Sequence, residues 1–256
     1  MQTGTINHVR YFLQLSFDGT RYHGWQIQKN AHSVQSELNS ALSTIIRQSI
    51  ETTGCGRTDT GVHARQFFVH FDIEAELQSP DDFVHQLNCI LSKDIAIQKL
   101  IPVHSDAHAR YDATARTYEY RIHQKKDPFQ NQYSAFYPYD LDLDAMNKLA
   151  DVLFEYSDFS CFSKTGTQNL TNICKISRAE WTVKKNESIF TISADRFLRN
   201  MVRAIVGTML EAGRGKLNEK QFRMILESKD RKEAGFSVPA EGLALIQVNY
   251  PYISKD

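Results

Sequence analysis

The chain has 256 residues, of which 41% are hydrophobic and 23% charged, and its 30 basic residues balance its 30 acidic ones. This length allows one large domain or two ordinary ones with ample core, and the composition is that of a globular protein, which excludes a disordered chain. The polar first ten residues and the lack of a long apolar run predict neither a signal peptide nor a membrane span, so we expect a cytoplasmic protein without a membrane partner.

Cysteine spacing and charge distribution exclude further classes. The four cysteines lie far apart and form no Cys-x-x-Cys pair, which argues against a disulfide framework and against a zinc site. Zero net charge argues weakly against a nucleic-acid partner, because counterion release rewards clustered Lys and Arg. Basic residues nevertheless gather in two stretches, 110–126 and 196–203, so a neutral total can hide a basic face.

The first fifth of the chain predicts a strand, a loop and a helix. Val9–Phe17 alternates and is rich in aromatic and branched residues, which indicates a strand. The segment Tyr22–Gln26 mixes aromatic and polar residues around a glycine, a pattern that suits either stacking on bases or packing of the loop onto its own domain. Ser33 is the expected N-cap of a helix that runs to Ile46 and buries one apolar face.

Residues 54–100 continue with a loop, a strand, a helix and a strand. Gly54–Ala64 is too rich in glycine for a helix or strand and predicts a shaped loop. Gln66–Ile73 alternates as a strand, Ser79 opens a helix through Leu91, and Ile95–Leu100 is a further strand. The order is that of a βαββαβ unit with helices on one face of a mainly antiparallel sheet. We expect a domain boundary here, dividing the chain into residues 1–104 and 105–256.

The second half repeats this scheme without a detectable sequence repeat. Asp142 and Asn218 are expected N-caps, and the best-defined helix runs from Phe197 to Ala212 with Gly213 as its stop. Arg196, Arg199 and Arg203 would share a face of that helix, at i, i+3 and i+7. The other expected elements are a strand at 116–123, a long loop at 158–172, a hairpin of 181–183 with 188–194, and a strand at 243–248.

The loop Gly54–Ala64 carries the strongest candidate for chemistry. Its sequence Gly-Cys-Gly-Arg-Thr-Asp-Thr-Gly-Val-His-Ala frames one carboxylate, Asp59, with arginines at positions 57 and 65. Such a carboxylate is either a solvated surface charge or an acid held ionised for catalysis. His63 is expected to hold the loop by a hydrogen bond rather than to titrate in catalysis.

Gly56-Arg57-Thr58-Asp59-Thr60-Gly61-Val62-His63-Ala64 resembles the Gly-Arg-Thr-Asp-Ala-Gly-Val-His-Ala signature of the tRNA pseudouridine synthase A family, with Thr60 as the one departure. The resemblance implies that Asp59 is the catalytic nucleophile. Without it, the arginines around the loop have two interpretations, a solvated face or phosphate contacts. With the motif around them, Arg57, Arg65 and Arg110 are candidates for RNA binding.

Further motifs of the same family follow in order. Arg116-Thr117-Tyr118-Glu119-Tyr120 resembles its Arg-x-Tyr-x-Tyr motif, which implies that Tyr118 packs on the target pyrimidine and acts in catalysis, and leaves Tyr120 structural. Phe197–Gly207 resembles its Phe-x-x-x-Met-Val-Arg-x-Ile-Val-Gly motif, whose arginine, here Arg203, pairs with the catalytic aspartate. Pro239–Leu245 resembles a segment that lines the cleft, which makes Leu245 a substrate-binding candidate. Taken alone, Tyr118 could equally be core packing and Arg203 a solvated charge.

The resemblance covers residues 11–248 and implies an α+β pseudouridine synthase fold. In it two ferredoxin-like halves form a continuous, mainly antiparallel sheet with helices on one side and a cleft between the halves. The implied activity is isomerisation of uridine to pseudouridine at positions 38, 39 and 40 of the tRNA anticodon stem-loop, with the base flipped out. It implies a homodimer that holds one tRNA. Reactant and product are isomers, so we expect no cofactor and no metal.

Two other classes remain open. A catalytically inactive RNA-binding member of the same fold would keep the basic face but would not need Asp59 together with Arg203. A hydrolase with paired carboxylates needs a second acid, and the motifs offer only Glu119, which points away from Tyr118 on the strand.

Overall fold

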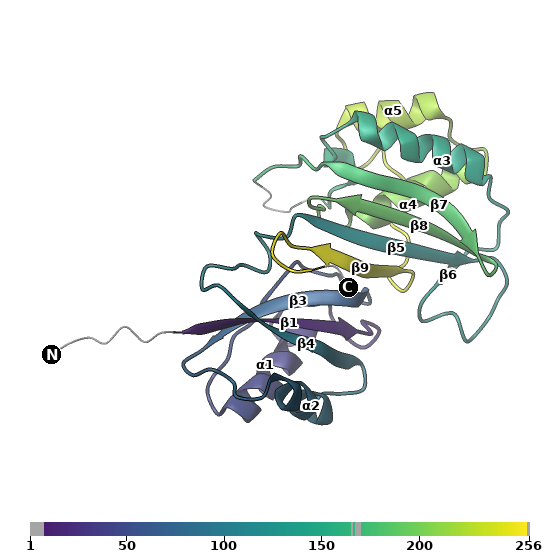
Figure 1. Cartoon of the computed structure of the whole chain (residues 1–256). Helices are drawn as coiled ribbons and strands as arrows, with labels where there is room; N and C mark the ends of the chain where they lie inside the picture. The colour runs from purple at the N-terminus through teal and green to yellow at the C-terminus, as the bar shows by residue number, and fades with distance from the viewer. Residues whose placement is uncertain (1–7, 165, 167–169, 255–256) are drawn as a thin grey trace. The chain divides into compact units, whose positions relative to one another are not determined.

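The computed structural model describes residues 8–164, 166 and 170–254 and divides into two compact units (Figure 1). The first unit is Met1–Thr114 with Gln247–Asp256, and the second is Ala115–Ile246. Strand β9, Leu243–Asn249, crosses this division, since its first four residues belong to the second unit and its last three to the first. Each unit is an α+β fold, as the sequence predicts.

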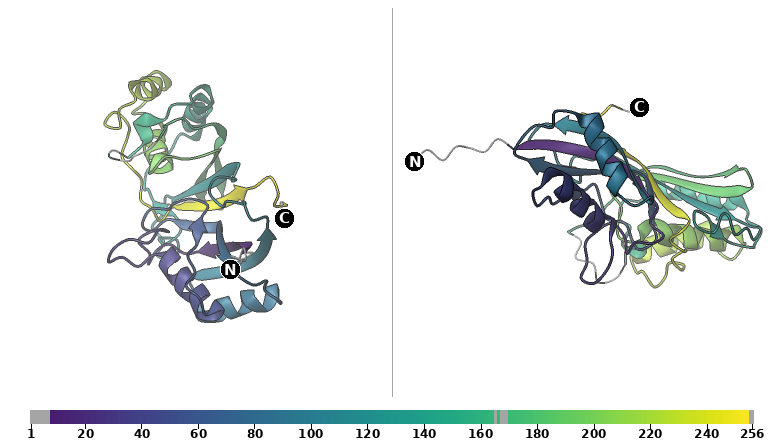
Figure 2. Two further views of the ribbon diagram at one scale, coloured as in Figure 1. Left: turned by 90° about the vertical axis from the view of Figure 1, so that its left-hand side faces the viewer. Right: turned by 90° about the horizontal axis from the view of Figure 1, so that it is seen from below.

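The first unit is built on strands in the order β4-β1-β3, with short β2 paired to β3. All these pairs are antiparallel, and Leu13 of β1 lies opposite Val69 of β3. Helices α1 and α2 lie on one face of these strands (Figure 2). The bounds of the elements are β1 Val9–Phe17, α1 Val34–Ile46, β2 Thr53–Gly54, β3 His63–Ile73, α2 Pro80–Ile90 and β4 Ile95–Val103.

Both faces of this small sheet are buried. Leu13 and Leu15 are fully buried, and so is Phe12, which points to the opposite face because successive side chains of a strand alternate. The ring of Phe12 packs edge-on against Tyr250, with 5.1 Å between the ring centres. The chain's last described residues therefore cover the face that α1 and α2 leave open.

The second unit has strands in the order β5-β8-β7, all antiparallel, with two-residue β6 parallel to β5. The hairpin β7–β8 turns at Lys185 and Asn186, both with positive φ, as a two-residue turn of the right twist requires. The bounds are β5 Ala115–His123, β6 Ala135–Phe136, α3 Leu143–Val152, η1 Leu153–Glu155, η2 Ser160–Phe162, β7 Ile176–Lys184, β8 Glu187–Ala194, α4 Met201–Gly213 and α5 Glu219–Ser228. The predicted loop at 158–172 contains η2, and its residues 165 and 167–169 lie outside the described part of the chain.

Three helix starts follow from local capping, as predicted. The hydroxyl of Ser33 accepts a hydrogen bond from the Ser36 amide, which begins α1. Asp142 caps α3 and Asn218 caps α5 in the same way. Ser79 stands at the N-cap of α2 without a side-chain hydrogen bond, so Pro80 in the first turn marks that start instead.

Helix α4 begins later than the sequence predicts. Asn200 adopts a left-handed conformation with φ of +67°, and the helix starts at Met201 rather than at Phe197. Arg196 and Arg199 consequently lie outside the helix and do not share a helical face with Arg203. The apolar periodicity continues through residues 197–200, and periodicity alone does not reveal one left-handed residue.

The division between the units also differs from the predicted one at residue 104. Residues 105–114 belong to the first unit because hydrogen bonds tie them to it. The Ala109 amide donates to Nδ1 of His70 at 3.0 Å, and Arg10 donates to the Ala107 carbonyl at 3.0 Å. The ferredoxin-like order of the halves, the continuity of their sheet and the cleft between them stay predictions.

Candidate active site

Asp59 begins a tight turn between β2 and β3. Its carbonyl oxygen accepts a hydrogen bond from the Val62 amide at 3.1 Å, and Gly61 inside the turn has φ of +79°. A residue with a Cβ rarely adopts that conformation, which explains the glycine. Asp59 itself is partly buried, and its neighbours Arg57 and Thr60 are exposed. The loop thus presents one carboxylate at a turn of fixed shape.

The segment Asp18–Trp25 packs against this turn. The Gly61 amide donates to the Tyr22 carbonyl oxygen at 3.3 Å, and the Gly19 amide donates to Nδ1 of His63 at 3.0 Å. His63 is 5% exposed, so it holds the loop by a hydrogen bond, as the sequence predicts.

Two glycines of this segment touch the turn's backbone directly. A Cβ atom on Gly24, whose φ is +85°, would lie 2.3 Å from the Thr58 carbonyl oxygen and 3.2 Å from the Asp59 carbonyl carbon. A Cβ on Gly19 would lie 2.0 Å from the Val62 carbonyl oxygen. Only glycine fits at either position, since the two backbones approach more closely than a side chain allows.

The aromatic residues of the segment are buried in the first unit. Trp25 is 2% exposed and packs on Phe67 of β3, with 4.4 Å between the ring centres. Tyr22 is also 2% exposed, and its hydroxyl donates to Glu37 of α1 at 2.9 Å and lies 2.9 Å from the Ser92 hydroxyl. Of the two interpretations left open by the sequence, packing onto its own domain is therefore the correct one for this loop.

The pKa values of Tyr22 and Glu37 are shifted in opposite directions. Burial raises the pKa of Tyr22 to about 12, so the phenol stays protonated and remains a donor. Burial alone would raise the pKa of Glu37, but hydrogen bonds from Ser92 and Tyr22 outweigh it and lower that pKa. Glu37 is therefore an ionised acceptor that ties the loop to α1.

The three candidate phosphate contacts are all exposed in the first unit. Arg57 lies two residues before Asp59, and Arg65 lies on β3. Arg110 lies in the segment that the His70 side chain anchors to β3, and its guanidinium is 5.7 Å from the ring centre of the exposed Tyr111. The three arginines thus come from three different segments of the first unit.

Tyr118 lies on β5 in the second unit and is partly buried. Its ring meets Phe197 edge to face, with 5.2 Å between the ring centres and an angle of 90°. Tyr120, two residues on, is fully buried and donates its hydroxyl to the Pro239 carbonyl at 2.9 Å. Burial raises the pKa of Tyr120 well above its ordinary value, which agrees with a structural role.

Arg203 on α4 is fixed by the backbone before β9. Its Nε donates to the Val238 carbonyl at 2.7 Å, and the Val238 amide donates back to the Arg203 carbonyl at 3.2 Å. Asn200 and Arg231 both donate to the Ser237 hydroxyl, at 2.6 Å and 2.9 Å, which fixes this backbone further. Arg203 is only partly exposed, so it is not a fully solvated surface charge.

The structure places these residues in both units. Asp59, Arg57, Arg65 and Arg110 belong to the first unit; Tyr118, Arg203 and Leu245 belong to the second. The predicted pairing of Asp59 with Arg203 stays a prediction. Leu245 is 1% exposed and packs in the core, so its contact with substrate also stays a prediction.

Sequence reasoning missed the supporting contacts of the site. Gly24 and Gly19 touch the Asp59 turn, and Glu37 holds the segment that packs on it, yet all three lie 22 to 40 residues before Asp59 in the chain. The only signal in the sequence was the pair of glycines that flank Tyr22. For Arg203 the missed partner is Val238, which lies 35 residues away.

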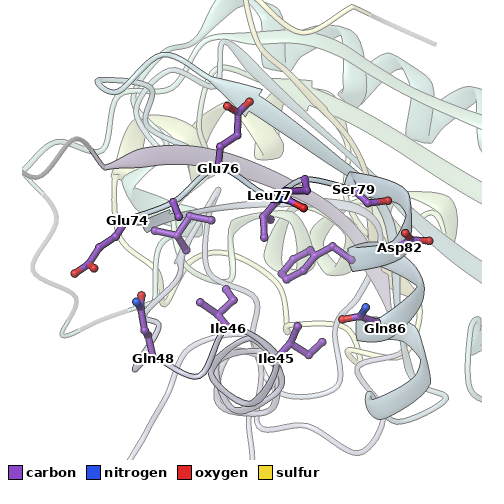
Figure 3. Close-up of a pocket in the computed structure, with 13 residues that line it drawn as sticks. Ile45, Ile46, Gln48, Glu74, Glu76, Leu77, Ser79, Asp82 and Gln86 are labelled. Carbon is purple, nitrogen blue, oxygen red and sulfur yellow. The ribbon is translucent and has the colours of Figure 1, made fainter.

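Figure 3 shows a pocket of about 430 Å³ in the first unit, between the end of α1 and the start of α2. Ile45, Ile46 and Phe83 line it together with the acidic residues Glu74 and Glu76. None of the predicted site residues lines this pocket, and its acidic side chains do not suit a phosphate backbone. It is therefore separate from the candidate site.

Neither metal ligation nor membrane insertion is indicated within the described residues. No group of three or more His, Cys, Asp or Glu side chains there has the arrangement of a metal site. Among those same residues, no helix has the length and apolar character needed to cross a bilayer.

Comparison with known proteins identifies a matching family and similar enzymes. A family model described as tRNA pseudouridine synthase matches residues 15–112 and 156–251, which include Asp59 and Arg203 but not Tyr118. A tRNA pseudouridine synthase A from Bacteroides fragilis is 53% identical over 243 residues, covering 94% of this chain and 96% of that protein. The enzyme of that name from Bacteroides thetaiotaomicron is 52% identical over 245 residues (94% and 91%), and one from an Exiguobacterium species is 38% identical over 241 residues (94% and 98%).

Proposed function

The chain belongs to the tRNA pseudouridine synthase family and is an isomerase, and we propose that it converts uridines 38, 39 and 40 of the tRNA anticodon stem-loop to pseudouridine with Asp59 as the nucleophile. The observation that carries this proposal is the family's aspartate motif on a turn of fixed shape. A nucleophile that is already positioned needs no reorganisation when the substrate arrives.

The reaction breaks the bond between uracil N1 and ribose C1′ and forms one between C5 and C1′. The proton on C5 leaves and N1 gains one, so atoms and electrons balance without a co-reactant. Asp59 could add to C1′, add to C6 of the ring, or assist a route in which the C2′ proton leaves first. In each route the carboxylate must be ionised and close to the flipped-out nucleoside.

The proposed partner of that carboxylate is Arg203. A carboxylate in a partly dry site needs a cation, because desolvation otherwise favours its neutral form. A guanidinium is charged at any physiological pH, and the hydrogen bond of Arg203 to the Val238 carbonyl limits the freedom of its side chain. This support makes Arg203 a better candidate for an ion pair than a mobile surface arginine.

Tyr118 is the proposed contact of the target base. Phe197 meets its ring at 90°, an arrangement that fixes the orientation of the ring. A partly exposed ring held in this way can stack on a flipped-out pyrimidine. Its predicted share in catalysis is part of the same proposal.

The exposed arginines support recognition through the RNA backbone. The segment with Arg110 is anchored at His70 of β3, five residues from Arg65 on the same strand. At about 3.3 Å per residue, these two points are roughly 17 Å apart. Arg65 and Arg110 would therefore contact different phosphates, a pattern that positions an RNA without reading its sequence. A homodimer that holds one tRNA and a cytoplasmic location complete the proposal.

The proposal is tested with Asp59→Asn, which keeps the size of the side chain and removes its charge. With tRNA labelled by tritium at uridine C5, the reaction releases tritium to water. We expect the single-turnover rate to fall by about 10⁴-fold or more, with tRNA affinity within about threefold. Asp140→Asn, at an exposed position in the second unit, is the matched control.

Tritium release by Asp59→Asn at the rate of the unsubstituted protein would contradict the assignment of the nucleophile. Tight tRNA binding without any release by the unsubstituted protein would favour the alternative, a catalytically inactive RNA-binding member of the fold.

A further inference from the structure

We propose that Gly24 is a positioning residue for catalysis, because its backbone contact with Thr58 and Asp59 sets the place of the Asp59 carboxylate. This inference rests on the proposed function of Asp59. Gly24 touches neither substrate nor reacting atoms in this proposal, and it acts through the backbone of the turn.

The contact at Gly24 leaves no room for any side chain. A Cβ atom there would lie 2.3 Å from the Thr58 carbonyl oxygen, and real Cβ contacts are essentially never shorter than 3.0 Å. The atoms in the way belong to the backbone of the catalytic turn, so they cannot rotate aside as a flexible side chain could. An added Cβ would therefore shift the backbone that carries Asp59.

The segment around Gly24 cannot yield easily in the other direction. The Tyr22 hydroxyl is held by Glu37 of α1 and faces Ser92, and the Ser92 amide donates to the same carboxylate at 2.9 Å. On the other side, the Gln35 amide donates to the Trp25 carbonyl at 3.0 Å. Since Tyr22 before the glycine and Trp25 after it are both fixed to the body of the unit, the shift passes mainly to the Asp59 turn.

The size of the shift follows from the distances. Moving the Thr58 oxygen from 2.3 Å to ordinary contact at 3.4 Å requires about 1.1 Å. A displacement of about 1 Å in a catalytic group costs about 100-fold in rate. The substitution should change RNA affinity little, because two of the three candidate phosphate contacts, Arg65 and Arg110, lie outside the turn that shifts.

The chain supplies a matched control. Gly215 has φ of +72°, close to the +85° of Gly24, but a Cβ there would meet nothing within 4 Å. Gly24→Ala and Gly215→Ala therefore introduce the same backbone strain, and only the first introduces a clash. We expect Gly24→Ala to lower kcat by about 100-fold at unchanged KM, whereas Gly215→Ala should keep the kcat of the unsubstituted protein.

Gly24→Asn separates the cost of backbone strain from the cost of the clash, because Asn tolerates a positive φ but still carries a Cβ. It should be as slow as Gly24→Ala. Recovery of the rate in Gly24→Asn, or equal rates for Gly24→Ala and Gly215→Ala, would overturn the inference. If the unsubstituted protein and Gly215→Ala both form no pseudouridine, the proposed function fails instead.

Tyr22→Phe provides a variant for the case in which Gly24→Ala does not fold. It removes the hydroxyl that Glu37 holds but keeps the buried ring. By loosening the same segment it should lower kcat several-fold without changing KM or tRNA affinity. A kcat equal to that of the unsubstituted protein would show that this segment does not position Asp59.

Discussion

His70 should make the first unit sensitive to acid. It lies on β3, is 7% exposed, and accepts the Ala109 amide at Nδ1 over 3.0 Å. Burial lowers the pKa of His70 to about 4, and the positive charges of Arg10 and His108 contribute in the same direction. Protonation would turn Nδ1 into a donor and remove one of the hydrogen bonds that tie residues 105–114 to the unit. Two nearby carboxylates oppose the shift, those of Asp72 and Asp112.

The direction and size of the effect follow from the two pKa values. The folded unit favours the neutral ring, whereas the unfolded chain takes up a proton near the ordinary histidine pKa of 6.5. His70 therefore costs no stability above pH 6.5, and the loss grows as the pH falls from 6.5 to about 4. At pH 5 the difference is about 1.5 pKa units, which corresponds to about 2 kcal/mol in the free energy of unfolding.

The measurement is urea denaturation at pH 7 and pH 5, followed by tryptophan fluorescence. In the background Trp181→Phe, the remaining Trp25 reports on the first unit. His70→Asn is the comparison, since its amide oxygen can replace Nδ1 as an acceptor and does not titrate. With a urea dependence of about 2 kcal/mol per M, the His70 protein should lose about 1 M more in its midpoint than His70→Asn.

His85 on α2 provides the control for histidine substitution as such, because it is exposed and its ring lies 3.6 Å from the Cys89 sulfur of the same helix. His85→Asn should keep the full dependence on pH. An equal loss of stability in the His70 protein and in His70→Asn would refute the reasoning, because the buried ring would then not be the group that titrates.

Two further predictions concern the second unit. Arg203→Ala should lower the single-turnover rate by about 10² to 10³-fold and leave tRNA affinity within about threefold. Arg203→Lys should recover only part of the rate, because lysine cannot reproduce the Nε hydrogen bond to Val238. A rate equal to that of the unsubstituted protein would show that Arg203 takes no part in the reaction. Gly207→Ala lies inside α4, where Gly→Ala ordinarily stabilises, but its Cβ would lie 1.8 Å from the Phe236 carbonyl oxygen. We expect a loss of about 1 to 3 kcal/mol in urea denaturation, and a gain in stability would contradict this contact.

Elements that depend on neighbouring residues were predictable from the sequence. The N-caps at Ser33, Asp142 and Asn218 accept hydrogen bonds from amides three residues on, so capping chemistry alone predicts them. The hairpin turn at Lys185 and Asn186 is equally local. His63 as a loop-holding residue was predicted as well, because a histidine inside a glycine-rich loop has backbone amides within reach.

Features that depend on distant residues were not predictable. The left-handed Asn200 delays the start of α4 to Met201, although the apolar periodicity of the sequence begins before it. Residues 105–114 are tied to the first unit by hydrogen bonds with His70 on β3 and Arg10 on β1, and nothing in the composition reveals those bonds. For the same reason the sequence predicts a glycine-rich turn at Asp59 but not the contact of Gly24 with the backbone of that turn.

In both units a close contact between two backbones at a glycine supports a residue of the family motifs, Asp59 in the first and Arg203 in the second. Gly24 meets the Asp59 turn in the first unit, and in the second Gly207 meets the carbonyl of Phe236, two residues before the Val238 that holds Arg203. Backbone atoms have no rotamers, so such contacts fix a position more rigidly than side-chain packing can. A reaction that depends on placing one carboxylate and one guanidinium gains most from this rigidity. It follows that substitutions at Gly24 and Gly207 should impair turnover more than substitutions at Gly215, where an added Cβ would meet nothing within 4 Å.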